Sequence, residues 1–229
     1  MKYLAGLDVG QAQDYAALAI AEYDERAGKG ETVYAFRYLH RWPLGTPYPA
    51  IVHDIPQILV HAPPRSVTLV LDATGVGRGV YDMFVDAHLV TAAVTLHGGH
   101  TVSYDKGYWR VPKRDLVTAV QVALQTSRLK IAKALELAPT LQQELLNFQY
   151  KLDLATAHDS YAAWREKDHN DLVLAVALAV WWGERLAQDR LPPLDLSRGL
   201  SGLRRPPRTP AAVPRLSGWQ AERLIDDDR

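Results

Sequence analysis

Three apolar segments of this chain each carry an aspartate at one end, and this pattern limits the folds that the chain can adopt. Two short apolar runs reach Asp8 and Asp72, and a long one, residues 170–188, begins beside Asp171. An apolar run of roughly four to eight residues suits a buried strand, whereas one of more than about ten suits a helix. We therefore expect two buried strands that deliver carboxylates at their ends and one helix with a carboxylate in its first turn.

The remaining patterns extend this outline. Apolar periodicity and Gly or Pro breaks predict strands over 3–9, 15–23, 32–39, 67–72 and 92–96, a short apolar piece over 129–131, and helices over 51–60, 80–87, 112–124, 139–148 and 170–188. Residues 98–110, rich in Gly, His and aromatic side chains, are predicted to form a loop, and residues 150–154 and 161–165 to pair as a hairpin. Strands first, then strands alternating with helices, predict an α/β domain: a mixed sheet of three antiparallel strands followed by parallel strands, flanked by helices.

The composition changes near residue 190. We expect one globular domain over residues 1–189 and a flexible tail rich in Pro and Arg over 190–229. The stretch from Arg198 to Arg215 contains no acidic residue, so it suits contact with phosphates or a partner protein equally as well as a solvated tail without a role.

Composition excludes several classes of site. The chain has no cysteine, which removes disulfides, thiolate zinc sites and cysteine nucleophiles. The formal net charge is zero, so binding to nucleic acid would depend on a local basic surface. There is no signal-like segment and no apolar run of about 20 residues, and we expect an intracellular protein that is not secreted and has no membrane partner.

The three aspartates suit a site for divalent metal. Magnesium and manganese prefer oxygen ligands, and two such ions about 3.5–4 Å apart can activate a water and stabilise a leaving oxygen. Asp8 on a central strand is the natural bridging ligand, with Asp72 on the adjacent parallel strand and Asp171 on the helix over the sheet end. Each acid alone has a simpler interpretation: Asp72 as a turn former with Thr74, and Asp171 as an acid favoured by the helix dipole. The prediction depends on the three together.

Four motifs in this order resemble the nuclease domain of the large terminase subunit of tailed bacteriophages: Asp8-Val-Gly10, Asp72-Ala-Thr-Gly-Val-Gly77, Lys113-Arg-Asp-Leu-Val117 and His169-Asn-Asp-Leu-Val-Leu-Ala175. The resemblance covers about residues 2–188. It implies an RNase H-like, or resolvase-like, fold and a metal-dependent endonuclease that cuts concatemeric viral DNA during genome packaging. It also implies two Mg²⁺ or Mn²⁺ ions, with Asp8, Asp72 and Asp171 as catalytic residues and metal ligands.

The chain departs from the family pattern in two ways. Asn170 stands where the family often has an acid, so Asn170 and Asp168 become candidates for additional metal ligands. The chain also lacks the G-x-x-x-x-G-K-[ST] phosphate loop of an ATPase motor. The implied partners are double-stranded DNA, a separate terminase ATPase subunit, the small terminase and the portal, in the cytoplasm of a bacterial host.

A set of basic residues is predicted to contact DNA: Lys106, Arg110, Lys113, Arg114, Lys167 and His169. Solvated surface charge is an equal alternative for most of them. Two alternatives for the whole chain remain open: a nuclease-like module that binds DNA or a partner with little activity of its own, and a nuclease similar to a Holliday-junction resolvase.

Overall fold

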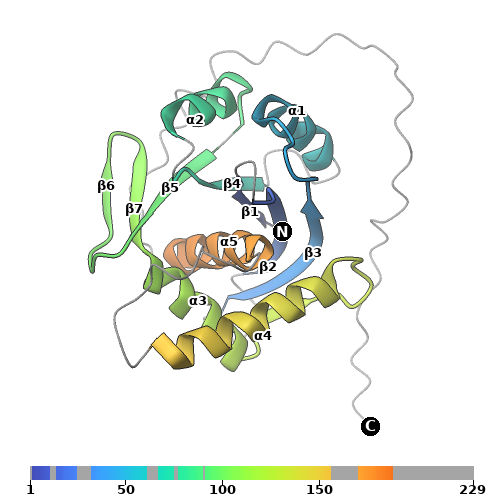
Figure 1. The fold of residues 1–229 in the computed structure, drawn as a ribbon, viewed down its shortest axis with the longest axis vertical. Coiled ribbons are helices and arrows are strands. Elements are labelled where there is room, and N and C mark those ends of the chain that lie inside the picture. The colour runs from blue at the N-terminus through green and yellow to red at the C-terminus, as the bar shows by residue number, and fades with distance from the viewer. Residues whose placement is uncertain are drawn as a thin grey trace.

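The computed structural model describes residues 2–10, 14–24, 32–60, 67–74, 77–89, 91–155 and 170–187. These residues form one eight-stranded sheet with helices on both faces (Figure 1). The strands are β1 (Lys2–Asp8), β2 (Ala17–Asp24), β3 (Val33–Arg41), β4 (Val67–Asp72), β5 (Thr91–His97), β6 (Ser103–Asp105), β7 (Tyr108–Pro112) and β8 (Leu129–Ile131). The helices are α1 (Tyr48–Leu59), α2 (Gly77–Asp86), α3 (Lys113–Gln125), α4 (Ala138–Ala155) and α5 (Asp171–Ala187).

The sheet has the order β6-β7-β5-β4-β1-β2-β3-β8. Strands β1, β2 and β3 are antiparallel neighbours, and β1, β4, β5 and β7 run parallel to one another. This confirms the predicted α/β, RNase H-like mixed sheet. Because β1, β4, β5 and β7 are parallel, their carboxyl ends all lie at one edge of the sheet, and the loops that follow them meet there.

Two predictions of local structure are wrong. Residues 98–110 are not a simple loop, because β6 and β7 pair across a tight turn in which Lys106 and Gly107 both have positive φ, 50° and 92°. Paired residues with positive φ are what a two-residue hairpin turn requires. Residues 150–154 do not form a strand, since α4 continues through them to Ala155. The other half of the predicted hairpin, 161–165, lies outside the described residues, as does the predicted tail from 190 onward.

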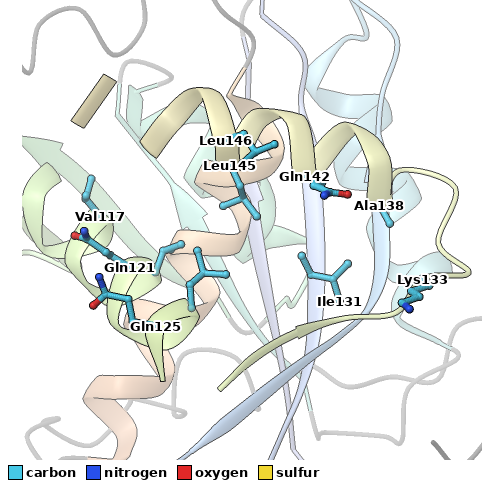
Figure 2. Close-up of a pocket in the computed structure, with 11 residues that line it drawn as sticks. Val117, Gln121, Gln125, Ile131, Lys133, Ala138, Gln142, Leu145 and Leu146 are labelled. Carbon is cyan, nitrogen blue, oxygen red and sulfur yellow. The ribbon is translucent and has the colours of Figure 1, made fainter. Parts of the chain in front are cut away.

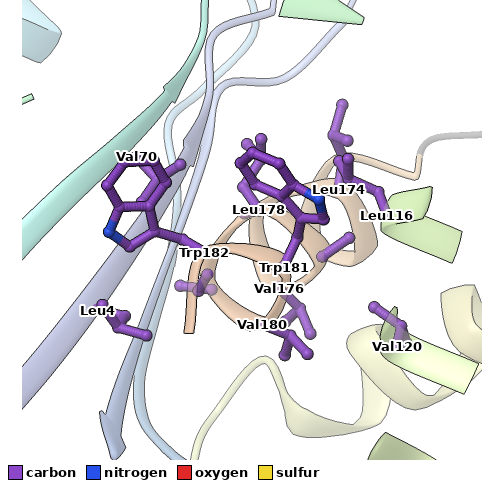
Figure 3. Close-up of a cluster of buried hydrophobic side chains, with 14 of the residues drawn as sticks. Leu4, Val70, Leu116, Val120, Leu174, Val176, Leu178, Val180, Trp181 and Trp182 are labelled. Atoms are coloured by element: carbon purple, nitrogen blue, oxygen red, sulfur yellow. The ribbon is translucent and has the colours of Figure 1, made fainter. Parts of the chain in front are cut away.

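The sheet separates two hydrophobic layers, as alternation along each strand requires. On β1, Leu4 packs toward α5, whereas Ala5 and Leu7 pack toward α1 and α2. Figure 1 shows α5 against one face of the sheet with α3 and α4 beyond it, and α1 and α2 on the opposite side. Helix α5 is buried over residues 171–183 because the sheet covers one side and α3 covers another, which explains why it is apolar all round (Figure 3).

Helix α5 lies unusually close to β1. A Cβ atom added to Gly6 would stand 1.9 Å from the carbonyl oxygen of Ala175, and one added to Gly183 would stand 2.9 Å from the Leu4 side chain. Gly183 thus lies over Leu4 and Ala175 over Gly6, so α5 runs antiparallel to β1. The first residue of α5 is therefore carried toward the end of β1 at which Asp8 lies. None of the helices in the described ranges is both long and apolar enough to cross a bilayer.

Candidate metal centre

Asp8 and Asp72 lie side by side at the carboxyl edge of the sheet. Strands β1 and β4 are parallel and pair Leu7 with Leu71, so the next residues, Asp8 and Asp72, are neighbours on strands spaced about 4.8 Å apart. Side chains an even number of positions apart on a strand point to the same face. Asp8 therefore shares the face of Leu4 on β1, and Asp72 that of Val70 on β4, and both of these apolar residues pack toward α5. Both are buried, with 8% and 1% exposure. Two carboxylates this close on rigid strands form the start of a cation site.

Asp171 comes from α5, the helix that covers this face of the sheet. It is the first residue of α5, one helical turn before Ala175, which contacts Gly6, and it is 5% exposed. Asn170 is buried too, and its carbonyl accepts the hydrogen bond from the Leu174 N–H that opens the helix. The structure therefore places all three predicted aspartates on the α5 side of the sheet, at the carboxyl end of β1.

Two residues that the sequence interpretation missed, Arg41 and Glu144, contact this end of α5. Arg41 ends β3, and Glu144 comes from α4. One Arg41 nitrogen, Nη2, forms a close ion pair with Glu144 and lies 3.6 Å from Oδ2 of Asp171. The Arg41 guanidinium also lies over the Tyr15 ring, at 4.8 Å from its centroid. Arg41 thus stands between the Glu144 and Asp171 carboxylates in a largely buried setting.

A β-bulge puts Arg41 on this face. Strand β3 pairs Tyr38 with Ile20 but Phe36 with Ala21, so Arg37 is an extra residue in the ladder. Without it, strict alternation from Phe36 would turn His40 toward α5 and Arg41 away; with it, Leu39 and Arg41 face α5. Cross-strand pairing then puts Asp8, Ala17 and Arg41 in one row. Sequence alternation alone gives the wrong phase after a bulge.

Glu144 closes the start of α5. Its Oε2 accepts hydrogen bonds from the backbone N–H groups of Leu172 and Val173, at 3.1 and 3.2 Å. These are groups that a helix leaves without partners in its own first turn, so Glu144 acts as a cap supplied by another helix. Burial raises the pKa of the Glu144 carboxyl, while Arg41 acts in the opposite direction. A charged residue at the position one turn after Leu141, on the apolar side of α4, was the available sequence signal.

The simpler interpretation of Asp72 is also realised in part. Its Oδ1 accepts the Thr74 N–H at 2.7 Å, which is the turn geometry expected of a strand-end aspartate. Thr74 in turn accepts the Leu96 N–H of β5 through its hydroxyl, also at 2.7 Å. These two bonds fix the orientation of the Asp72 carboxylate. A fixed carboxylate is compatible with metal binding, because ligating carboxylates in proteins are themselves hydrogen-bonded.

The donor set suits Mg²⁺ or Mn²⁺, since buried carboxylate oxygens converge on one sheet edge. In the described residues, however, no three His, Cys, Asp or Glu side chains are placed closely enough to hold an ion together. Asp8 and Asp72 fit the first two ligand positions, while Asp171 is engaged with Arg41. The other predicted site residues near Asp171, namely Lys167, Asp168 and His169, lie outside the described residues.

The predicted DNA-contacting residues follow the β6–β7 hairpin and the start of α3. Lys106 is in the hairpin turn and Arg110 on β7, both exposed. Lys113 and Arg114 begin α3 directly after β7, at the same sheet edge as the three acids. Arg114 donates to the His100 carbonyl at 2.9 Å, which ties α3 to the loop after β5. Lys113 and Arg114 therefore lie at the acidic edge, whereas Lys106 lies at the amino end of β7, and Arg110, between the α5-facing Trp109 and Val111, points to the other face.

An apolar hollow lies elsewhere in the molecule. A groove of about 430 Å³ runs between α3, α4 and β8, where Val117, Gln121, Leu145 and Leu146 line it (Figure 2). Among the lining residues the only charged side chain is Lys133, and none is acidic. The groove therefore offers no carboxylate to a cation. A smaller hollow of about 200 Å³, bordered by Gly10 and Asp14, lies beyond the end of β1, near the acids.

Known proteins offer matches in structure but not in sequence. No protein-family model matches the chain, and no curated protein matches it. The large terminase nuclease from thermophilic phage G20c is 15% identical with a TM-score of 0.49, over 78% of this chain and 80% of that one. The Mn-soaked terminase nuclease domain of human cytomegalovirus is 12% identical with a TM-score of 0.44, over 80% and 84%. RuvC of T. thermophilus, in complex with a Holliday junction substrate, is 10% identical with a TM-score of 0.41, over 82% and 96%. At these identities the likeness concerns the fold alone.

Proposed function

We propose that this chain is a metal-dependent endonuclease that cleaves double-stranded DNA, with Asp8, Asp72 and Asp171 as its metal ligands. The observation that carries the proposal is the placement of Asp8 and Asp72 at the ends of adjacent parallel strands, on the face that α5 covers with Asp171. The order of the four terminase-like motifs supports the same activity.

Each acid has a distinct part in this proposal. Asp8, on the central strand β1, would hold metal together with Asp72 on the adjacent strand β4. Asp72, with its orientation fixed by Thr74, holds one side of the site, and Asp171 approaches from the helix. When bound, two Mg²⁺ or Mn²⁺ ions supply an activated water and stabilise the leaving oxygen of the phosphodiester. The carboxylates position these ions and balance their charge.

The substrate class rests on the basic residues beside the acids. Lys113 and Arg114 begin α3 at the same sheet edge as the acids, so a duplex that reaches the acids can meet these two cations. Phosphate contacts of this kind position DNA without reading its sequence. The terminase-like motifs further suggest a role in phage genome packaging inside the bacterial host, together with a separate ATPase subunit, the small terminase and the portal.

Plasmid cleavage tests the proposal. The purified chain is incubated with supercoiled DNA in Mg²⁺, Mn²⁺ or EDTA, beside Asp72→Ala, Asp8→Ala and a control, Asp86→Ala, at an exposed position at the end of α2. We expect metal-dependent nicking by wild type and the control and none by the two site variants. Cleavage that survives both site substitutions would contradict the assignment.

Two observations favour an alternative, a module that binds DNA or a partner but cleaves weakly. Asn170 replaces a second acid, and Asp171 is engaged with Arg41. An inert wild type that gains strong cleavage with Asn170→Asp would support that alternative. A resolvase-like nuclease is the third possibility, and comparing duplex, RNA–DNA hybrid and four-way junction substrates separates it from a duplex endonuclease.

A further inference from the structure

We propose that Arg41 is a built-in counter-cation of the candidate metal centre: it occupies the Asp171 carboxylate and weakens the binding of divalent metal, which must draw Asp171 away. This inference rests on the proposed function and concerns the regulation of the same site. Its starting point is that Asp8 and Asp72 are adjacent while Asp171 is 3.6 Å from a guanidinium nitrogen.

Several contacts fix the position of the Arg41 side chain, so its guanidinium is a positive charge at a defined place. The β3 bulge turns it toward α5, Glu144 pairs with it, and Tyr15 lies beneath its guanidinium. Its side chain keeps only 16% exposure, and Glu144 and Asp171 keep 7% each, so solvent screens these charges weakly. A guanidinium held in this way repels a dication at the neighbouring carboxylates.

The positive charge of Arg41 is shared between two carboxylates and does not neutralise a single partner. Glu144 already has two backbone N–H donors at the start of α5 in addition to Arg41. Arg41 therefore serves two carboxylates, Glu144 and Asp171, with one positive charge. The second carboxylate, at the longer distance, is the one that a metal ion beside Asp8 and Asp72 can take over.

Calorimetric titration with Mn²⁺ tests this on the intact chain. Arg41→Met keeps the length of the side chain but removes its charge, and we expect Mn²⁺ to bind on the order of tenfold tighter than to wild type. Arg41→Lys keeps the charge and should bind close to wild type. Arg128→Met is the matched control, because Arg128 is a buried arginine paired with Glu184 at the other end of α5, and its loss should leave the affinity unchanged.

A second variant keeps the test open if Arg41→Met fails to fold. Glu144→Gln retains a carbonyl oxygen that can accept the N–H groups of α5 but leaves Asp171 as the remaining carboxylate of Arg41. Mn²⁺ should then bind several-fold more weakly than to wild type, as expected when the negative charge falls and Arg41 is held more firmly by Asp171.

The outcomes separate the two proposals. Mn²⁺ binding that is equal or weaker in folded Arg41→Met, or as strong in Glu144→Gln as in wild type, overturns the role of Arg41 and leaves the nuclease proposal standing. Absence of Mn²⁺ binding in wild type, Arg41→Met and Arg41→Lys alike overturns the proposed function, and the inference with it. Metal bound by Arg41→Met but not by wild type would be the strongest support.

Discussion

The two ends of α5 are each held by an arginine and a glutamate, but they differ in the number of carboxylates around the arginine. At the C-terminal end, Arg128 pairs with Glu184, which also accepts the Tyr34 hydroxyl at 2.8 Å, and Arg128 donates to the Thr32 carbonyl. At the N-terminal end, Arg41 faces Glu144 and Asp171, with Asp8 in the same cross-strand row.

Under the proposed function, this difference separates a purely structural contact from one at the metal centre. One cation with one anion, completed by neutral donors and acceptors, is a satisfied network that fixes a helix end. Several buried carboxylates around one cation cost folding free energy, and proteins tolerate that cost where a ligand is to be bound. The C-terminal end of α5 therefore fixes the helix, while the N-terminal end, within the described residues, brings more carboxylates than arginines together, as the proposed metal centre requires.

The largest expected effect is a loss of stability, and it tests whether the close packing of α5 against β1 holds both ends of this helix in place. Gly6→Ala puts a Cβ 1.9 Å from the Ala175 carbonyl, a backbone atom that cannot turn aside, and we expect a loss of about 3 kcal/mol or more of unfolding free energy. Gly183→Ala meets the Tyr34 ring at 2.3 Å instead, and a side chain can shift, so a smaller loss is expected. Urea denaturation measures both; equal losses would mean that α5 is not fixed on β1 at Gly6.

Much of the site follows from local sequence signals, and its remainder depends on tertiary structure. Asp8 and Asp72 were predictable because each ends a short apolar run, and parallel neighbouring strands bring such ends together. Asp171 was predictable from the long apolar helix that follows it. The fold followed from the same signals, since three strands preceded the first alternating strand and helix.

Arg41 and Glu144 were not predicted, for physical reasons that differ. The phase of Arg41 depends on a bulge at Arg37, which no residue type in β3 announces. Glu144 lies on the apolar side of α4, but its role as a cap of α5 depends on a contact across 28 residues. The missed hairpin had a local signal in Lys106-Gly107, whereas α4 continues past residue 148, where the sequence pattern had predicted its end.

The next largest effect is the loss of stability when either arginine is replaced by methionine, which compares Arg41 and Arg128 directly. Arg128→Met leaves the Glu184 carboxylate without its cation, and because Glu184 keeps 26% exposure we expect a loss of about 2 kcal/mol rather than the full cost of a buried charge. Arg41→Met should destabilise the metal-free protein similarly. Thermal melts should show a larger stabilisation by Mn²⁺ for Arg41→Met, which binds the ion more tightly, than for Arg128→Met, which should gain only as much as wild type. Equal stabilisation of both would remove the distinction between the ends.

A smaller effect is expected from the uncharged hydrogen bond in the network at the C-terminal end of α5. Tyr34→Phe removes the hydroxyl that donates to Glu184, and we expect a loss of about 1 kcal/mol. Burial, then the charge of Glu184, raises the pKa of the Tyr34 hydroxyl, so the group stays a donor throughout the accessible pH range. Cleavage per folded molecule should be unchanged, measured beside wild type at matched folded concentration. A selective loss of cleavage would extend the functional site to this end of α5.

The smallest expected effect separates the two faces of β3. His40 neighbours Arg41 but points to the opposite face because of the bulge, where its ring stacks on Tyr38 and meets Trp42 edge-on. Burial lowers the pKa of His40 below its ordinary 6.5, with Asp54 acting against this. A lowered pKa means that the unfolded chain binds the proton more readily, so this contribution to stability is present above pH 6.5 and declines as the pH falls below it.

His40→Phe keeps the ring and removes the titration. We expect wild type to lose stability relative to His40→Phe as the pH falls below 6.5, measured by urea denaturation at each pH. The Mn²⁺ affinity of His40→Phe at neutral pH should equal that of wild type, in contrast to Arg41→Met one residue along the strand. If His40→Phe changed the affinity as Arg41→Met does, the effect would belong to β3 as a whole, and the bulge would not separate a stabilising face from a metal-binding one.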